Sequence, residues 1–215
     1  QERERVLERL GDIERLGGDN DSCMKHWDEA ILLLTKLQEK EKTATLHRKM
    51  ANVLWNTRGD KEKAKEHHEA ALKILEAEPE SMELARVYED LGHMLRRMGS
   101  VTEAIAWTQK AIQLAEKLNA LEVVACAYVE YANQVGIMGD LKKGLEYANR
   151  ALSIALSNNY LETAVNAYER VGEWLPAEEY EKRLEYYEKG YELAKKIGSI
   201  SQSGFFLFLL AGEYI

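Results

Sequence analysis

The chain has 215 residues, of which 46% are hydrophobic and 31% are charged, so it can bury a continuous core and is not a disordered chain. Its formal net charge is −8 at pH 7, which argues against general nucleic-acid binding because that function draws on dense patches of Lys and Arg. It has only two cysteines, no signal peptide and no apolar run of membrane-spanning length, so we expect a cytoplasmic protein without disulfides or a membrane partner.

The predicted elements are helices that follow one another in a repeating pattern. A large apolar residue followed by a small one first occurs at position 10 and recurs at intervals of 40 or 41 residues. The pairs are Leu10-Gly11, Met50-Ala51, Leu91-Gly92, Tyr131-Ala132, Val171-Gly172 and Ala211-Gly212. Turn glycines recur with the same period, at Gly18, Gly59, Gly99 and Gly139. A fixed period of this length predicts an array of repeats that bury their apolar faces against one another.

Each repeat is predicted to be a hairpin of two helices, as residues 85–118 illustrate. Val87 and Leu91 lie on one face of a first helix. Gly99 can end this helix in the left-handed conformation, and Ser100 can cap the second helix. One domain is expected over 1–215, with repeats at about 2–40, 43–78, 81–118, 120–158 and 160–198 and a partial repeat at 199–215.

The last part of the chain departs from this pattern. Leu175-Pro176-Ala177 stands where a Gly-Asp turn is expected, and because Pro is favoured at the first helical position we expect a helix from Pro176 to about Ile197. The final helix, at about 201–214, contains a segment that is apolar all round. This helix lacks a second helix to pair with. We therefore expect that it can mediate self-association and that the chain is a fragment of a longer protein.

The pairs and turns resemble the tetratricopeptide repeat family, whose pattern continues with small residues five and twelve positions after the turn glycine. In this chain those residues are Ala64 and Ala71, Ala104 and Ala111, and Gly144 and Ala151. The resemblance covers essentially the whole chain and implies an all-α, right-handed α–α superhelix of about five helical hairpins plus one terminal helix. The period is near 40 residues rather than about 34. Similar long repeats occur in kinesin light chains, in bacterial peptide-sensing regulators and in the sensor regions of signalling ATPases.

The resemblance also implies that the first helices of the hairpins form a concave binding surface. The family's groove positions lie five and two residues before, and two and five residues after, the large residue of each pair. Carried over to this chain, they give the predicted partner-binding residues Arg48, Asn52, Trp55, Arg86, His93, Arg96 and Asn133. Trp55 is the strongest candidate for a binding hot spot among them.

Asn52, His93 and Asn133 occupy the same position in three successive repeats. A side-chain amide offers both a donor and an acceptor, so such a row can bind the backbone of an extended peptide. The alternative is a solvated polar face without a ligand.

The arginines among these residues, Arg48, Arg86 and Arg96, predict a partner with acidic character. The alternative is that they pair with carboxylates of the chain itself, such as Glu89.

An enzyme is not expected. No histidine pair has the spacing of a metal site on a helix, no glycine-rich phosphate loop is present, and neither cysteine has an activating partner. We therefore predict no catalytic residue, no metal and no cofactor. Three functions stay open. The chain can be a scaffold that binds a protein or peptide in its groove, a ligand-sensing regulatory domain of a larger signalling ATPase or transcription regulator, or a self-associating array.

Overall fold

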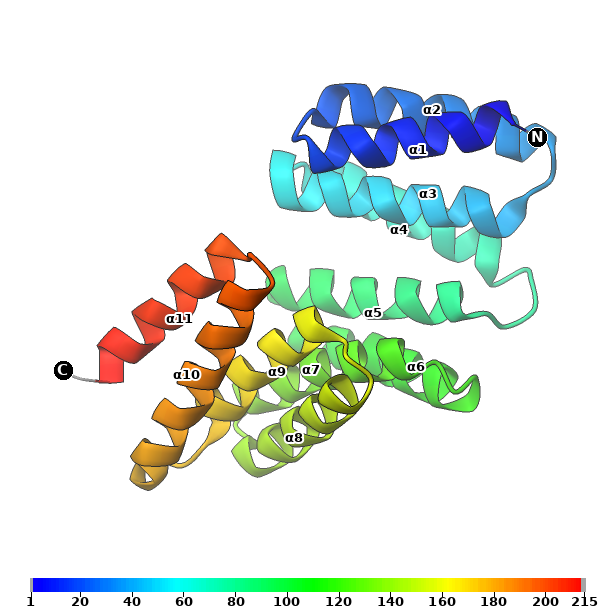
Figure 1. The fold of residues 1–215 in the computed structure, drawn as a ribbon. Helices are drawn as coiled ribbons and strands as arrows, with labels where there is room; N and C mark the ends of the chain where they lie inside the picture. The colour runs from blue at the N-terminus through cyan, green and yellow to red at the C-terminus, as the bar shows by residue number, and fades with distance from the viewer. Residues whose placement is uncertain (1, 214–215) are drawn as a thin grey trace. The chain divides into compact units, whose positions relative to one another are not determined.

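The computed structural model describes residues 2–213, and this part of the chain consists of helices and turns without a strand (Figure 1). The α-helices are α1 (Arg3–Leu16), α2 (Asn20–Lys36), α3 (Lys40–Val53), α4 (Lys61–Leu75), α5 (Met82–Arg97), α6 (Val101–Lys117), α7 (Leu121–Ile137), α8 (Leu141–Ser157), α9 (Leu161–Trp174), α10 (Tyr180–Lys196) and α11 (Ile200–Glu213). The predicted all-α class is confirmed. Residues 214 and 215 of the expected partial repeat lie outside the described residues.

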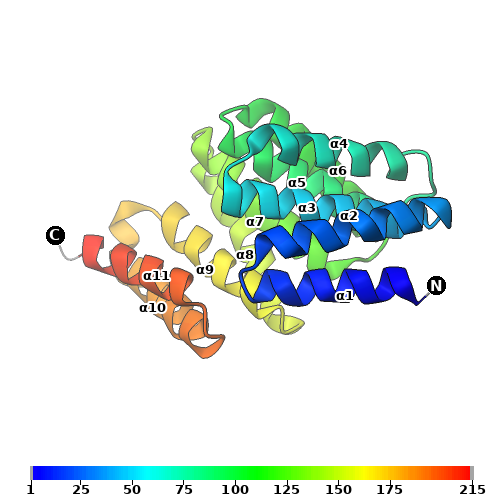
Figure 2. The same ribbon diagram turned by 90° about the horizontal axis from the view of Figure 1, so that it is seen from above.

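The contacts divide the chain into two compact units, Gln1–Val87 and Tyr88–Ile215, with the boundary inside α5. In the first unit α1 packs against α2, and α3 against α4, as antiparallel hairpins (Figures 1 and 2). In the second unit α7 pairs with α8, and α9 with α10, in the same way. Helices α6, α8 and α10 each also pack against the helix that follows them. Hairpins that are stacked in sequence order are what the repeat pattern predicts.

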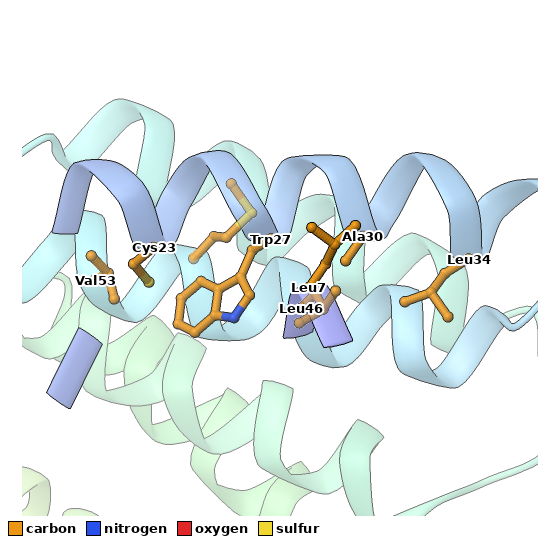
Figure 3. Packing of buried hydrophobic residues seen from close by; sticks show 8 residues of the cluster. Leu7, Cys23, Trp27, Ala30, Leu34, Leu46 and Val53 are labelled. Atoms are coloured by element: carbon orange, nitrogen blue, oxygen red, sulfur yellow. The ribbon is translucent and has the colours of Figure 1, made fainter. Parts of the chain in front are cut away.

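The core of the first unit surrounds Trp27, which is fully buried. Its ring lies between Cys23 and Val53 on one side and Leu7 and Leu46 on the other (Figure 3). The small residue of the first pair makes room for it, because a Cβ atom at Gly11 would lie 2.5 Å from the indole ring. The small residue of the pair therefore leaves the space in which a large side chain of the second helix packs between the two helices.

Each of the four turn glycines is followed by an aspartate or a serine, and three of these four residues cap the next helix. Asp19, Asp60 and Asp140 each accept a hydrogen bond from the backbone N–H three residues later, at 3.1 to 3.2 Å. Ser100 makes no side-chain cap hydrogen bond, so the predicted cap at this position is wrong. Its backbone N–H still closes the turn, by donating to the carbonyl of Leu95.

The helix expected from Pro176 begins later than predicted. Leu175 and Pro176 have extended backbone angles, a 3-10 turn follows at Ala177–Glu179, and α10 begins at Tyr180. Proline disfavours the helical conformation in the residue before it, which keeps Leu175 extended. Pro176 therefore precedes the helix instead of occupying its first position.

The last helix, α11, exposes much of its apolar surface. The side chains of Leu207 and Phe208 are 50% and 71% exposed, whereas Phe206 is buried against α10. Self-association through 201–214 stays a prediction.

Candidate functional site

A cavity of about 260 Å³ opens in the second unit between α5, α7 and α9. Each of these is the first helix of its hairpin. Three of the predicted binding residues, His93, Arg96 and Asn133, line this cavity together. The remaining lining residues are Glu89, Cys126, Val129, Glu130, Thr163, Asn166, Glu169 and Arg170.

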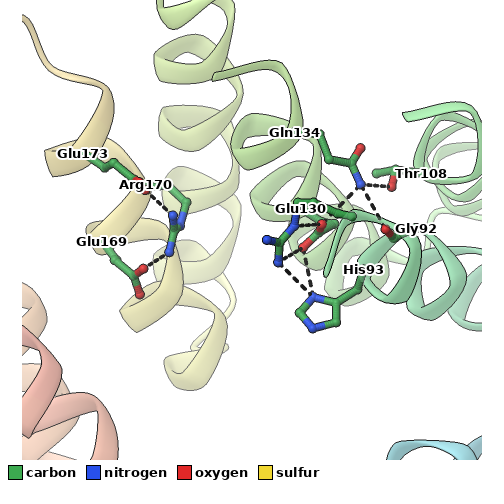
Figure 4. A network of polar contacts seen from close by, with 9 residues as sticks. Gly92, His93, Thr108, Glu130, Gln134, Glu169, Arg170 and Glu173 are labelled. Atoms are coloured by element: carbon green, nitrogen blue, oxygen red, sulfur yellow. Dashed lines mark hydrogen bonds and ion pairs between the residues drawn. The ribbon is translucent and has the colours of Figure 1, made fainter. Parts of the chain in front are cut away.

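Glu130, on α7, is a buried carboxylate that receives hydrogen bonds from two helices (Figure 4). The Nε of Arg96 donates to its Oε1 at 2.5 Å, and the Nδ1 of His93 lies 3.1 Å from its Oε2. Burial by itself raises the pKa of Glu130, but the hydrogen bond and charge of His93, together with Arg96, outweigh burial and lower this pKa to about 2. Glu130 is therefore ionised at neutral pH, and Arg96 is neutralised within the protein.

Gln134 fixes the position of this carboxylate from the core side. It is fully buried, and its Nε2 donates to the Oε1 of Glu130 at 3.2 Å and to the Oγ1 of Thr108 at 2.8 Å. The same nitrogen lies 3.4 Å from the carbonyl oxygen of Gly92 on α5 (Figure 4). The amide thus connects α5, α6 and α7 beneath the cavity, so the floor of the cavity is held by the packing of two hairpins.

A second cation of the cavity is also paired. The guanidinium of Arg170, on α9, forms ion pairs with the carboxylates of Glu169 and Glu173 (Figure 4). Burial lowers the pKa of Arg170, and the charge of Glu173 opposes this effect. Both arginines that line the cavity therefore have carboxylates of the chain as partners, which is the alternative that the sequence left open.

Asn133 differs from the other polar residues of the cavity. Its side chain is only 9% exposed and makes no hydrogen bond with another described residue. The neighbouring polar groups have partners, since the Sγ of Cys126 lies 3.3 Å from the Oγ1 of Thr163 and Asn166 accepts a hydrogen bond from Gln202. The Asn133 amide is therefore available to a ligand that enters the cavity.

The other predicted residues lie in the first unit. Arg48 donates from its Nε to the Oε1 of Glu83 at 2.6 Å, and both side chains are largely buried. Trp55 is half-buried, with the Nζ of Lys61 at 5.7 Å from its ring centroid. Arg86 is half-buried on α5 and lines neither this unit's cavity nor the cavity of the second unit.

Asn52 lines a cavity of about 340 Å³ in the first unit. The other residues around this cavity are Asp12, Arg15, Gly18, Asn20, Lys49, Val53, Asn56 and Thr57. Trp55 is not among them. The structure thus brings His93, Arg96 and Asn133 together in one cavity and places Asn52 in the other.

Sequence reasoning missed Glu130 and Arg170, the groups that carry most of the electrostatics in the second unit. Each directly precedes the large residue of its pair, Tyr131 or Val171. The positions carried over from the family lie two or five residues away and therefore skip these groups. A charged residue next to an apolar core position is a signal that could have identified both.

Among the described residues, no group of three or more His, Cys, Asp or Glu side chains could hold a metal ion. A search of the same residues for a helix long and apolar enough to cross a membrane found none.

Two family models described as tetratricopeptide repeat match this chain, over residues 2–77 and 85–118. A search of curated proteins gave no match.

Several solved structures are similar to the chain in fold. A Rap protein complexed with competence and sporulation factor is 18% identical, with a TM-score of 0.77 over 98% of this chain and 64% of that chain. The Rap conjugation gene regulator of plasmid pLS20, in complex with the Phr* peptide, is 18% identical, with a TM-score of 0.75 over 94% of this chain and 56% of that chain. A signal transduction ATPase with numerous domains and a tetratricopeptide repeat sensor, from Pyrococcus horikoshii, is 18% identical, with a TM-score of 0.68 over 98% of this chain and 32% of that chain. The chain therefore spans less than two thirds of each of these proteins.

Proposed function

Because this chain belongs to the tetratricopeptide repeat family, we propose that it is a protein–protein interaction module that holds an extended peptide, or an extended segment of a partner protein, on its first helices. The module acts by binding rather than by catalysis, and its place is the cytoplasm. The observation that carries the proposal is Asn133, a residue that is nine-tenths buried and lines the second unit's cavity, and whose amide has no partner among the described residues.

The chemistry of an amide fits a peptide backbone. Asn133 offers two N–H donors and a carbonyl acceptor, which match the C=O and N–H groups of a peptide unit whatever the ligand's side chains are. Around it, Arg96 and Arg170 are already paired with carboxylates. This part of the cavity therefore supports a ligand segment without charge, and an acidic partner is not required by these two arginines.

A second candidate function is that of a peptide sensor within a larger signalling protein. It is favoured by the fold similarity to a Rap regulator in complex with a peptide and to an ATPase whose repeats are described as a sensor. In that case the peptide bound at Asn133 would control another domain. The two candidates share the same site and differ only in what the binding event regulates.

The test is a selection from a library of extended peptides displayed on phage, carried out with the wild-type chain and with Asn133→Ala. We expect that wild type enriches a set of peptides and that Asn133→Ala weakens their binding about tenfold, the loss expected for one buried hydrogen bond. The melting temperature should not fall, because the amide has no partner within the protein to lose. Asn149→Ala, on the exposed face of α8, serves as the matched control. Peptides that bind Asn133→Ala as tightly as wild type would overturn the proposal.

A further inference from the structure

A second cavity of the second unit lies between α6, α7 and α8 and has a volume of about 380 Å³. It shares no lining residue with the Asn133 cavity, and two of its three walls are second helices of hairpins. Most of its lining side chains can donate or accept hydrogen bonds, and a guanidinium and a carboxylate are among them. Pockets that bind small molecules measure about 300–1,000 Å³, so this cavity suits a molecule at the small end of that range.

The phenol of Tyr128 lies between these two charges. Tyr128 is buried on α7, and its Oη accepts a hydrogen bond from the Nη2 of Arg150, on α8, at 2.6 Å. The same oxygen donates to the Oε1 of Glu116, on α6. Burial, followed by the hydrogen bond to Glu116, raises the pKa of Tyr128 to about 12, so the phenol keeps its proton at neutral pH. A guanidinium and a carboxylate are therefore both held by one neutral oxygen atom.

Neither of these charges has an ion-pair partner within residues 2–213. Glu146 precedes Arg150 by one helical turn, at the spacing at which Glu185 and Lys189 pair on α10 at 2.6 Å. In the described part of the chain Arg150 does not form the corresponding pair, and its guanidinium carbon lies 4.5 Å from the ring centroid of Tyr128. A guanidinium that stacks on a ring keeps N–H donors at its edge, and these can reach a ligand.

Two glutamines of α6 extend the polar lining beyond the charged groups. Gln109 donates from its Nε2 to the Oη of Tyr131 at 3.2 Å, which leaves its side-chain carbonyl as an acceptor. Gln113 lies one helical turn further along α6 and makes no hydrogen bond with another described residue. Because an amide offers both donors and an acceptor, a ligand that reaches the two charges can place a polar group against these glutamines.

We propose that this cavity binds a free α-amino acid, with its carboxylate on Arg150, its ammonium on Glu116 and an uncharged polar side chain along Gln109 and Gln113. An α-amino acid carries both charges on one carbon atom, so it can reach a cation and an anion that are hydrogen-bonded to the same phenol. A segment inside a peptide chain carries neither charge. The ligand class therefore differs from that of the Asn133 cavity, and the proposal does not depend on the function proposed there.

The experiment is a titration of the isotope-labelled chain with matched small probes, followed through the side-chain amide signals of Gln109 and Gln113. L-glutamine carries both charges, N-acetyl-L-glutamine lacks the ammonium, and L-glutamine α-amide lacks the carboxylate. We expect a saturable shift with L-glutamine and about tenfold weaker binding of each derivative, because each loses one charge-assisted hydrogen bond. L-alanine keeps both charges but has no side-chain amide, and it should bind about fivefold more weakly than L-glutamine.

Two variants assign the two charges separately. Arg150→Gln should bind L-glutamine and its α-amide equally while it still discriminates against N-acetyl-L-glutamine. Glu116→Gln should do the reverse. Glu146→Gln, one turn before Arg150, is the matched control and should keep both preferences. All three side chains are exposed, so the melting temperatures should stay close to that of wild type.

Tyr128→Phe tests the part played by the phenol. Without the hydroxyl oxygen, Arg150 and Glu116 can pair with each other directly, so we expect L-glutamine to bind about tenfold more weakly. A melting temperature close to that of wild type would show that the fold is kept. Should this variant fail to fold, the exposed Arg150→Gln and Glu116→Gln still test the site.

The absence of a saturable shift with L-glutamine, or equal binding of the three glutamine probes, would overturn the amino-acid site. Unchanged preferences in Arg150→Gln or Glu116→Gln would overturn the assignment of the charges, and equal binding of L-alanine would overturn the role of the glutamines. The side-chain amide signal of Asn133 reports on the other cavity in the same spectra. A shift of that signal alone would place the amino acid there and would also overturn the proposal.

Discussion

The two units differ in the titratable groups that hold their first helices in place. These groups are a pair of histidines in the first unit and a buried carboxylate in the second. In the first unit His47, on α3, and His67, on α4, face each other with their Nδ1 atoms 2.9 Å apart. Such a contact is a hydrogen bond only when at least one ring is neutral, because two protonated rings would both present N–H groups. Burial, followed by the charge of His67, lowers the pKa of His47 to about 4. In the second unit the anchor is Glu130, which is ionised.

This difference teaches how one repeat pattern can carry different chemistry. The hairpins of both units use the same large-small pairs, and all of them except α9–α10 use the same turn glycine. That pattern does not determine which polar and charged side chains lie between the helices. A neutral imidazole pair tolerates partial burial without a counter-charge, whereas a buried carboxylate needs hydrogen bonds and a counter-charge. Arg96 supplies the charge, and Arg96 and His93 both contact the carboxylate. We therefore expect the second unit to depend on the ionised carboxylate of Glu130 and the first unit to depend on its His47–His67 pair staying neutral.

The largest expected effect is the loss of the second unit's anchor. Glu130→Ala leaves Arg96 and His93 next to a cavity without their carboxylate and should destabilise the second unit by about 3–5 kcal/mol. Hydrogen exchange of the α7 backbone amides during chemical denaturation measures this loss. The exposed Glu162→Ala on α9 is the control and should change stability by less than about 0.5 kcal/mol. If Glu130→Ala were as stable as this control, the charge of Glu130 would not be what stabilises the second unit.

The packing of the first unit should respond to a single methyl group. Gly11→Ala would place its Cβ against the Trp27 indole, so we expect a loss of about 1–3 kcal/mol from overpacking. Thermal unfolding followed by Trp fluorescence measures it. Gly17→Ala, whose Cβ would have its nearest neighbours at 3.5 Å, should be close to neutral. Equal effects at the two positions would show that the indole can move aside.

Acid should destabilise the first unit before the second. The pKa of His47 is lower in the folded chain than its ordinary value of 6.5, so the unfolded chain takes up the proton first. Stability is kept above pH 6.5 and is lost as the pH falls toward about 4. Burial lowers the pKa of His67 as well, although Asp28 and Glu66 oppose this. The folded pKa of Glu130 is about 2 against an ordinary 4.5, so its contribution is lost only as the pH falls from 4.5 toward 2.

Hydrogen exchange at a series of pH values resolves the two units and checks this order. His47→Gln, which cannot be protonated, should reduce the loss of stability in the first unit between pH 6.5 and 4. If both units lost stability together near pH 5, in wild type and in His47→Gln alike, the acid sensitivity of the first unit would not come from His47.

The smallest expected effect concerns the caps, which the two units share. Asp60→Ala and Asp140→Ala should each cost about 1 kcal/mol, because each removes one side-chain bond to a helix N-terminus. Ser100→Ala should be close to neutral, since Ser100 makes no such bond. Urea denaturation of the three variants tests this. A loss at Ser100 equal to that at Asp140 would mean that the helix is capped in another way in solution.

The sequence predicted the fold because the repeat period fixes helix pairing directly. Gly11 leaves the space that the Trp27 ring occupies, as the small residue of the pair was expected to do. Of the residues carried over from the family, His93, Arg96 and Asn133 line one cavity, and their role in binding stays a prediction. The partner of His93 and Arg96 could not be predicted, since Glu130 lies 37 and 34 residues away along the chain. Which carboxylate a long side chain reaches across repeats depends on rotamers and packing.

The turn of the second repeat shows a different limit. The spacing from Met50 to Gly59 is nine positions where the first, third and fourth repeats have eight, but a count alone does not say whether a loop or a helix absorbs the extra residue. The structure absorbs it in a π-helical turn at Leu54–Arg58, and Asn56 rather than Trp55 lines the first unit's cavity. Trp55 stays a prediction as a binding hot spot, and the structure places its ring near Lys61.

The central claim is that the buried amide of Asn133 is the anchor for a peptide in the second unit. The most direct measurement is the side-chain amide signal of Asn133 in the labelled chain, recorded with and without a peptide selected on wild type. We predict that this signal shifts in step with binding and that its N–H protons become protected from exchange. A peptide that binds with full affinity while the Asn133 signal stays unchanged would contradict the account.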